Sequence, residues 1–208
     1  MPAGRPKDSV TPTRSLTPTE QNVVLTIARA QSDRDYILML WLLNTGCRIG
    51  ETCKVRVEQI MAGGNVAENC VLKATQTKSK QARRVFINTV LRKELARYLR
   101  ERTGDSEWLF AGRGGKKHLN PAYGSQLVRK IFEAAAIDQP SHCTRSTFAT
   151  NLAIRRGVSP FVLKQLMGHS SIQTTNVYVK VSSIDLQGAV ETLNEEPGTS
   201  AKKRISYL

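Results

Sequence analysis

The segment RDYILMLWLLNTG, residues 34–46, constrains the fold most, because it is apolar on nearly every side. A helix at a protein surface keeps one polar face, so a segment without such a face must be surrounded by other elements. The segment is also shorter than the run of about 18 apolar residues that a membrane span needs. It therefore predicts a buried helix at the centre of the core.

Helical patterns flank this segment on both sides. Residues 17–20, TPTE, predict a helix start in which Thr17 is the N-cap, Pro18 occupies the first helical position and Glu20 completes a capping box. The helix continues through QNVVLTIARA. Further helices are expected at about 89–102 and 121–136, in three stretches between 142 and about 179, and over an amphipathic segment at 183–194.

The β-type signal is confined to residues 55–88. Short β-branched runs, VRVEQI, CVLKATQ and RRVFIN, are separated by AGGN and by the polar stretch TKSKQA. We expect a small antiparallel sheet whose last hairpin carries Lys78 and Lys80 at its tip. The predicted fold class is therefore α+β, mainly helical, with one small antiparallel sheet.

The ends of the chain differ from its middle. Residues 1–16 are rich in Pro, Ser, Thr and charge, and such a stretch buries too little apolar surface to offset its ordering entropy. We expect a disordered basic arm over 1–16, one domain over 17–195 and a flexible tail over 196–208.

The charge balance points to nucleic acid. Lys and Arg number 31 against 17 acidic residues, a net charge of +14, which attracts polyanions. Aromatic residues make up only 6% of the chain, few for stacking unpaired bases, so duplex DNA is favoured over single strands. Basic ribosomal and membrane-surface proteins remain alternatives on charge alone.

The four cysteines lack C-x-x-C pairs, which favours reduced thiols and no zinc site. No signal peptide is evident, and together with reduced thiols this favours a cytoplasmic location.

Two arginine motifs are candidate phosphate-binding elements. In NTGCRIGE, Arg48 follows a glycine turn, and Glu51 could orient Arg48 or a neighbouring cation. In HCTRSTF, His142 and Arg145 are three residues apart and share a face if the segment is helical, where an anion between them would relieve their repulsion. A surface ion pair and a solvated basic face are the respective alternatives.

A third motif, GHSSIQTTNVYVK, places Tyr178 nine residues after His169. Together with T-G-x-R-x-x-E and H-x-x-R, it resembles the signature of the tyrosine recombinases, or phage-type integrases, in order, spacing and residue types over about residues 17–186. The hairpin KSKQARRVFI is similar to that family's K-x-x-x-x-R-x-V-P-L pattern. The resemblance implies Lys78 as the hairpin lysine, with Lys80 as the alternative.

The chain departs from the family pattern in two respects. Thr144, Ser146 and Met167 replace residues common in the family, which puts packing or target choice in doubt more than activity. Only 47 residues precede Arg48, whereas most members carry a separate DNA-clamping domain there. The chain therefore looks like the short, catalytic-domain-only members, similar to the fimbrial phase-variation recombinases.

The resemblance implies a site-specific DNA recombinase that cleaves and rejoins duplex DNA through a 3′-phosphotyrosyl intermediate, in integration, excision or inversion. The two arginines would stabilise the phosphate, the histidines would exchange protons or donate hydrogen bonds, the lysine would protonate the leaving 5′ oxygen and the tyrosine would attack. The implied site residues are Arg48, Lys78, His142, Arg145, His169 and Tyr178, with Glu51 in a supporting role.

Neither ATP nor a metal is expected, because the sequence contains no Walker loop and no carboxylate cluster for two-metal hydrolysis. The expected partners are double-stranded DNA and further copies of the chain, as a tetramer on paired sites, joined through the helix at 183–194. Packing of that helix on its own core is the alternative, and a helper protein is left open. Two rival functions are a type IB topoisomerase-like nicking-closing enzyme and a recombinase-derived DNA-binding regulator.

Overall fold

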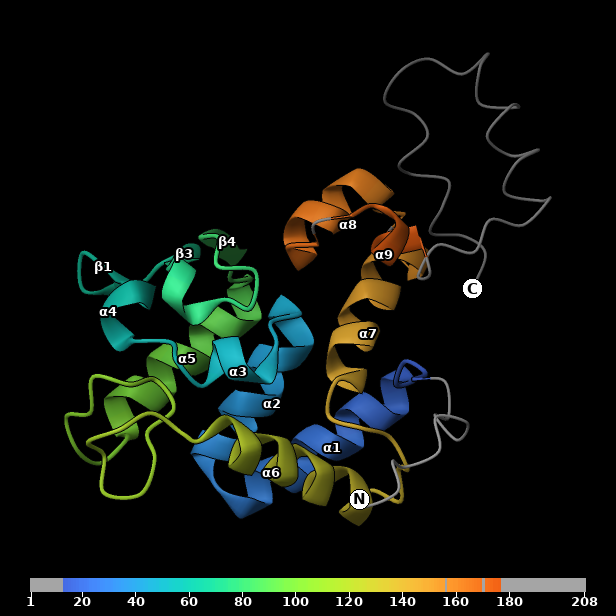
Figure 1. The fold of residues 1–208 in the computed structure, drawn as a ribbon. Helices are drawn as coiled ribbons and strands as arrows, with labels where there is room; N and C mark the ends of the chain where they lie inside the picture. The colour runs from blue at the N-terminus through green and yellow to red at the C-terminus, as the bar shows by residue number, and fades with distance from the viewer. Residues whose placement is uncertain (1–12, 156, 170, 177–208) are drawn as a thin grey trace, which may run out of the picture.

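The computed structural model describes residues 13–155, 157–169 and 171–176, and this part of the chain is mainly helical (Figure 1). Helix α1 (Pro18–Gln31) begins with the predicted capping box. The Glu20 N–H donates to Thr17 Oγ1 at 3.2 Å, and the Thr17 N–H donates to Glu20 Oε2 at 2.8 Å. Each side chain thus satisfies a backbone donor that the first helical turn leaves unpaired.

Helix α2 (Asp33–Thr45) is the centre of the main core. Residues 37–43 are all buried, and Trp41 is completely so. Helices α1, α5 (Thr89–Glu101) and α7 (Cys143–Thr150) pack against it, as Figure 1 shows for α1 and α7. The prediction of a surrounded, apolar central helix is confirmed.

The β region differs from the prediction in one element and in the number of sheets. The run VRVEQI is not a strand, because Val57–Ile60 forms the short helix α4. The Arg56 N–H donates to Gln59 Oε1 at 2.9 Å, and Gln59 Nε2 donates to the Val71 carbonyl at 2.8 Å. This local capping by Gln59 outweighs the β preference of the two valines.

The strands form two small hairpins instead of one sheet. Strands β1 (Met61–Ala62) and β2 (Asn65–Val66) pair around the two glycines of AGGN. Strand β3 (Asn69–Leu72) pairs antiparallel with β4 (Arg83–Phe86), with Leu72 opposite Arg83. The predicted hairpin that carries the lysines is therefore present, with the 3-10 helix η1 (Ala74–Gln76) leading into its loop.

The remaining expected helices are present within the described ranges. Helix α6 (Pro121–Ala134) follows the Gly-rich loop, and a short helix that was not expected, α3 (Ile49–Thr52), follows α2. After α7 come the π-helix η2 (Asn151–Arg155), α8 (Pro160–Met167) and α9 (Gln173–Asn176). The helix expected at 183–194 and the tail at 196–208 lie outside the described residues.

Helix α8 belongs to a second, smaller hydrophobic cluster. Its residues Leu163 and Met167 pack with Ala149 of α7, apart from the main core. In Figure 1, α8 and α9 lie at one end of α7. The end of α8 leads directly to His169, so this arrangement places one predicted site residue on a separate part of the domain.

The described chain begins before the expected domain boundary at Thr17. Leu16 is buried, and its N–H donates to Thr147 Oγ1 at 2.9 Å. The last residues of the expected arm therefore pack on α7, whereas residues 1–12 lie outside the described ranges. All four cysteines are buried, free thiols. Among the described helices, none is both long and apolar enough to cross a membrane.

Candidate active site

The turn between α2 and α3 positions Arg48. Helix α2 ends at Gly46, whose φ of +60° is the left-handed conformation that favours glycine. A Cβ atom at this position would also collide with the Phe148 ring on α7. Two residues later, Arg48 donates its N–H to Glu51 Oε2 and its Nη1 to Glu51 Oε1, both at 3.0 Å. Glu51 therefore fixes both the backbone and the guanidinium of Arg48.

Glu51 also binds a second arginine. It is only 2% exposed, and its Oε2 accepts a hydrogen bond from Arg83 Nη2 at 2.8 Å. Burial by itself would raise the pKa of this carboxyl, but the charge of Arg83 and the hydrogen bonds from Arg48 and Arg83 lower it overall. Glu51 is therefore an ionised group that orients both Arg48 and a neighbouring cation.

Arg145 is held by backbone carbonyls. Its side chain is buried, with Nη2 donating to the Met167 carbonyl at 2.5 Å and Nη1 donating to the Gly46 carbonyl. Burial lowers the pKa of Arg145 to about 10, with further lowering by the charges of Arg48 and Arg83. Within the described part of the chain, no carboxylate forms an ion pair with Arg145. Two backbone carbonyls thus fix this guanidinium, and none of the described carboxylates is paired with it.

His169 follows the left-handed turn at Gly168 that ends α8. Its Nδ1 lies 2.9 Å from Thr175 Oγ1, and Thr175 is fully buried. Burial lowers the pKa of His169 to about 4, and the charges of Arg145, Arg48 and Arg83 contribute in the same direction. The imidazole is therefore neutral near pH 7 and can donate a single N–H.

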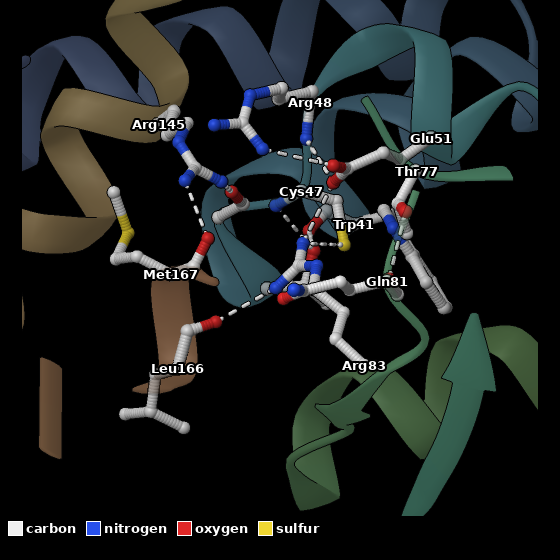
Figure 2. Close-up of polar contacts among 12 residues, drawn as sticks. Trp41, Cys47, Arg48, Glu51, Thr77, Gln81, Arg83, Arg145, Leu166 and Met167 are labelled. Atoms are coloured by element: carbon white, nitrogen blue, oxygen red, sulfur yellow. Dashed lines mark hydrogen bonds and ion pairs between the residues drawn. The ribbon is translucent and has the colours of Figure 1, made fainter. Parts of the chain in front are cut away.

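Figure 2 shows arginines from three elements in one cluster: Arg48 at the start of α3 and Arg83 on β4 are bonded to Glu51, and Arg145 on α7 is bonded to the Met167 carbonyl. Glu51 is the carboxylate that pairs with the first two. Three guanidiniums and one carboxylate in this cluster leave a net positive charge that an anion would neutralise. A phosphate, with several oxygen acceptors, matches the fork of donors on a guanidinium.

The hairpin lysines lie outside this cluster. Thr77 Oγ1 donates to the Gln81 carbonyl at 2.8 Å and thereby closes the loop that holds Lys78 and Lys80. Both lysine side chains are exposed, and Lys80 has a φ of +54°. Neither side chain forms a hydrogen bond or an ion pair with another described residue, so the choice between them stays open.

The structure does not bring His142 into the cluster either. His142 is the exposed N-cap of α7, and its Nε2 lies 2.7 Å from Thr13 Oγ1. Its spacing of three residues from Arg145 therefore does not place the two side chains together here, since Arg145 points into the interior. Tyr178 lies outside the described residues.

The positions that depart from the family pattern are interior ones. Thr144, Ser146 and Met167 are all buried, and Met167 supplies the carbonyl that holds Arg145. The substitutions therefore fall on packing positions.

Arg83 was assigned no function from the sequence, although it stands at the arginine of the K-x-x-x-x-R-x-V-P-L pattern, and the structure shows which face of β4 it occupies. On β4, Val85 is buried whereas Arg84 and Phe86 are exposed. Because side chains alternate between the two faces of a strand, Arg83 shares the inward face with Val85. An arginine on the buried side of a strand needs a partner, and this pattern identifies it as a candidate.

The sequence profile of the phage integrase family matches residues 14–183, and the chain belongs to that family.

Three similar proteins illustrate the relationship. The tyrosine recombinase XerA of Pyrococcus furiosus is 31% identical over 191 residues, covering 91% of this chain and 65% of the relative. The Tn1549 transposon integrase, solved with circular intermediate DNA, has a TM-score of 0.70 at 22% identity, covering 89% of this chain and 69% of that chain. The catalytic domain of bacteriophage HP1 integrase has a TM-score of 0.63 at 22% identity, covering 88% of this chain and 97% of that chain.

These comparisons confirm the predicted fold class, because the solved structures share this fold. The chain spans between 59% and 65% of the length of three XerA relatives that it matches, which is less than two thirds.

Proposed function

We propose that this chain carries the catalytic part of a site-specific DNA recombinase, which cuts duplex DNA and rejoins it through a 3′-phosphotyrosyl intermediate. Membership of the phage integrase family supports the reaction class. The observation that carries the proposal is the group of three arginines, Arg48, Arg83 and Arg145, with one buried carboxylate among them.

The arginine cluster suits attack on a phosphodiester. Such attack adds negative charge to the non-bridging oxygens, and donors already in place stabilise that charge more than the ground state. Arg145 is fixed by the Gly46 and Met167 carbonyls, and Arg48 by Glu51. A guanidinium has five N–H donors, so each of these side chains keeps donors for the phosphate.

Tyr178 is the proposed nucleophile. A phenol has an ordinary pKa near 10, so it attacks only when a neighbour takes its proton or nearby cations favour the phenolate. The same arginines provide the cations. His169, as a neutral imidazole, would donate its N–H to the phosphate.

Two further groups complete the proposed proton transfers. His142 would accept a proton or donate to the phosphate, which requires its ring to leave Thr13. Lys78, or Lys80, would protonate the departing 5′ oxygen from the exposed hairpin loop. The phosphotyrosyl link keeps the energy of the broken bond, so a hydroxyl from another strand reverses the attack without ATP.

Duplex DNA in the cytoplasm is the proposed partner, supported by the net charge of +14 and by the DNA bound in the structure of the Tn1549 integrase. We further propose that copies of the chain assemble as a tetramer on paired sites through residues 183–194. A helper protein is compatible with this assembly.

The test is a covalent adduct with nicked duplex DNA that contains the target site. Wild type is expected to form the adduct, whereas Tyr178→Phe is expected to form none and to bind DNA within about twofold of wild type, because only one hydroxyl is removed. An adduct that persists in this variant would refute Tyr178 as the nucleophile.

The same assay separates the rival functions. Relaxation of supercoiled DNA by a monomer, without recombination of paired sites, would identify a type IB topoisomerase-like enzyme. Sequence-specific binding by wild type with no adduct on any nicked target would identify a DNA-binding regulator.

A further inference from the structure

The turn that carries His169 is weakly attached to the main core by apolar contacts. Helix α8 contributes Leu163 and Met167 to the small cluster on α7, while Phe161 and Val162 on the same helix are 74% and 49% exposed. A helix with so little buried apolar surface needs other interactions to keep its position.

Arginine side chains supply those interactions at the C-terminal end of α8. The Leu166 carbonyl accepts a hydrogen bond from Arg83 Nη1 at 2.8 Å, and the next carbonyl, of Met167, accepts one from Arg145 Nη2 at 2.5 Å. The last carbonyls of a helix lack partners within the helix and form the negative end of its dipole. They are therefore good acceptors for a guanidinium.

Arg83 connects this turn to the other half of the site. Its side chain is only 10% exposed, and its Nη2 donates to Glu51 Oε2 at 2.8 Å and contacts Cys47 Sγ at 3.2 Å. Its aliphatic part lies against Gly168, where an added Cβ atom would be only 2.7 Å from Arg83 Cδ. Figure 2 shows this side chain between Leu166 on one side and Glu51 and Cys47 on the other.

We propose that Arg83 is a positioning residue for strand transfer, which holds the C-terminal turn of α8, and with it His169, against the Glu51–Arg48 pair. The proposal rests on the function proposed above, because His169 must meet the same phosphate as Arg48. Arg83 also begins strand β4, so the same contacts anchor the base of the hairpin that carries Lys78.

The shape of the guanidinium is the essential feature. One fork bonds Glu51 through Nη2 and Leu166 through Nη1 at the same time. A lysine at this position keeps the charge, but its single nitrogen is a point charge without a fixed fork. Arg83→Lys is therefore expected to keep the pairing with Glu51 and to release the α8 turn.

The test compares Arg83→Lys with Arg84→Lys, the same change at the next residue of β4, whose side chain is exposed. Hydrogen exchange is measured at the Gly168 and His169 amides, which donate to the Gln165 and Lys164 carbonyls, both at 3.1 Å. Exchange in the free protein is expected to be about tenfold faster in Arg83→Lys, the effect of losing one hydrogen bond to a charged group. Arg84→Lys is expected to match wild type.

The second readout separates catalysis from binding. At saturating nicked DNA, adduct formation by Arg83→Lys is expected to be about 100-fold slower than by wild type. This is the effect of misplacing a group by about 1 Å at a reacting centre. The affinity of the variant for DNA should stay within about twofold of wild type. Arg84→Lys is expected to cleave at the wild-type rate.

Unchanged exchange at Gly168 and His169, or cleavage by Arg83→Lys within threefold of wild type, would overturn the positioning role. If wild type forms no adduct, the proposed function fails. The exchange result then still decides whether Arg83 holds the turn.

Discussion

Arg97 and Arg145 are held in this domain by opposite kinds of partner, carboxylates for Arg97 and backbone carbonyls for Arg145. Arg97 lies on α5 and pairs with three carboxylates, those of Asp33 at 2.8 Å, Glu94 at 3.3 Å and Glu101 at 2.7 Å. The hydrogen bond to Asp33 contributes most to raising the pKa of Arg97. This arginine belongs to a partly exposed network of ion pairs in which carboxylates offset its charge.

Arg145 has the reverse environment. It is buried, and its partners among the described residues are two carbonyl oxygens. Burial lowers its pKa, and the charges of two other guanidiniums lower it further. Burying a guanidinium without an ion pair costs stability, and the described residues give Arg145 hydrogen bonds to carbonyls in place of a paired carboxylate. In the proposed function, this difference separates a structural arginine, Arg97, from Arg145, which would meet the phosphate of the DNA.

The largest effect should follow from Arg145→Gln. Removal of one fixed donor at the reacting phosphate is expected to slow cleavage by about 10² to 10³-fold. The measurement is the rate of adduct formation on nicked DNA at saturating protein. A rate within threefold of wild type, in a variant that still folds and binds DNA, would contradict the role of Arg145 in the site.

Glu51→Gln should mainly affect stability. The change leaves Arg48 and Arg83 without their buried carboxylate and is expected to lower the free energy of unfolding by about 3 kcal/mol near pH 7. Because the pKa of Glu51 is lowered in the folded state, its contribution is fully present above its unfolded pKa of about 4.3 and is lost as pH falls through the lower folded value.

Urea unfolding of wild type and Glu51→Gln between pH 7 and pH 3 checks both points. The difference in the free energy of unfolding between the two proteins should become smaller below about pH 4. Glu94→Gln, in the exposed network, is the matched control and should cost less than about 1 kcal/mol. Equal losses in the free energy of unfolding for Glu51→Gln and Glu94→Gln would show that the buried carboxylate and the network around Arg97 contribute alike.

The smallest effect is expected for Arg97→Gln. Its ion pairs are partly exposed and screened, so the free energy of unfolding should fall by less than about 1 kcal/mol. Adduct formation should stay at the wild-type rate. A loss of cleavage comparable to that of Arg145→Gln would show that general positive charge, and not the buried cluster, drives the reaction.

Sequence reasoning succeeded where the determinants are local. The buried helix α2 follows from a continuous apolar segment, and the start of α1 follows from the four residues TPTE. The pairing of Arg48 with Glu51 is similarly local, because the two residues are three apart. The strand expected at VRVEQI failed because the side chain of Gln59 caps a helix and also bonds strand β3.

The rest of the site depends on contacts between distant segments. Arg145 bonds the carbonyl of Gly46, which is 99 residues away, and Arg83 bonds Leu166, which is 83 residues away. No spacing rule predicts such pairs, because they follow from how α7 and α8 pack near the end of α2. For the same reason, the motif spacing could not tell that His142 contacts Thr13 and not the arginines.

The central claim is that Arg145 acts on the negative charge of the scissile phosphate. The most direct test compares wild type and Arg145→Gln on nicked DNA with either a normal phosphate or a neutral methylphosphonate at the cleavage position. We expect the variant to be slower by about 10² to 10³-fold on the phosphate and by less than about tenfold on the methylphosphonate, where the charge is absent. An equally large loss on both substrates would contradict the claim.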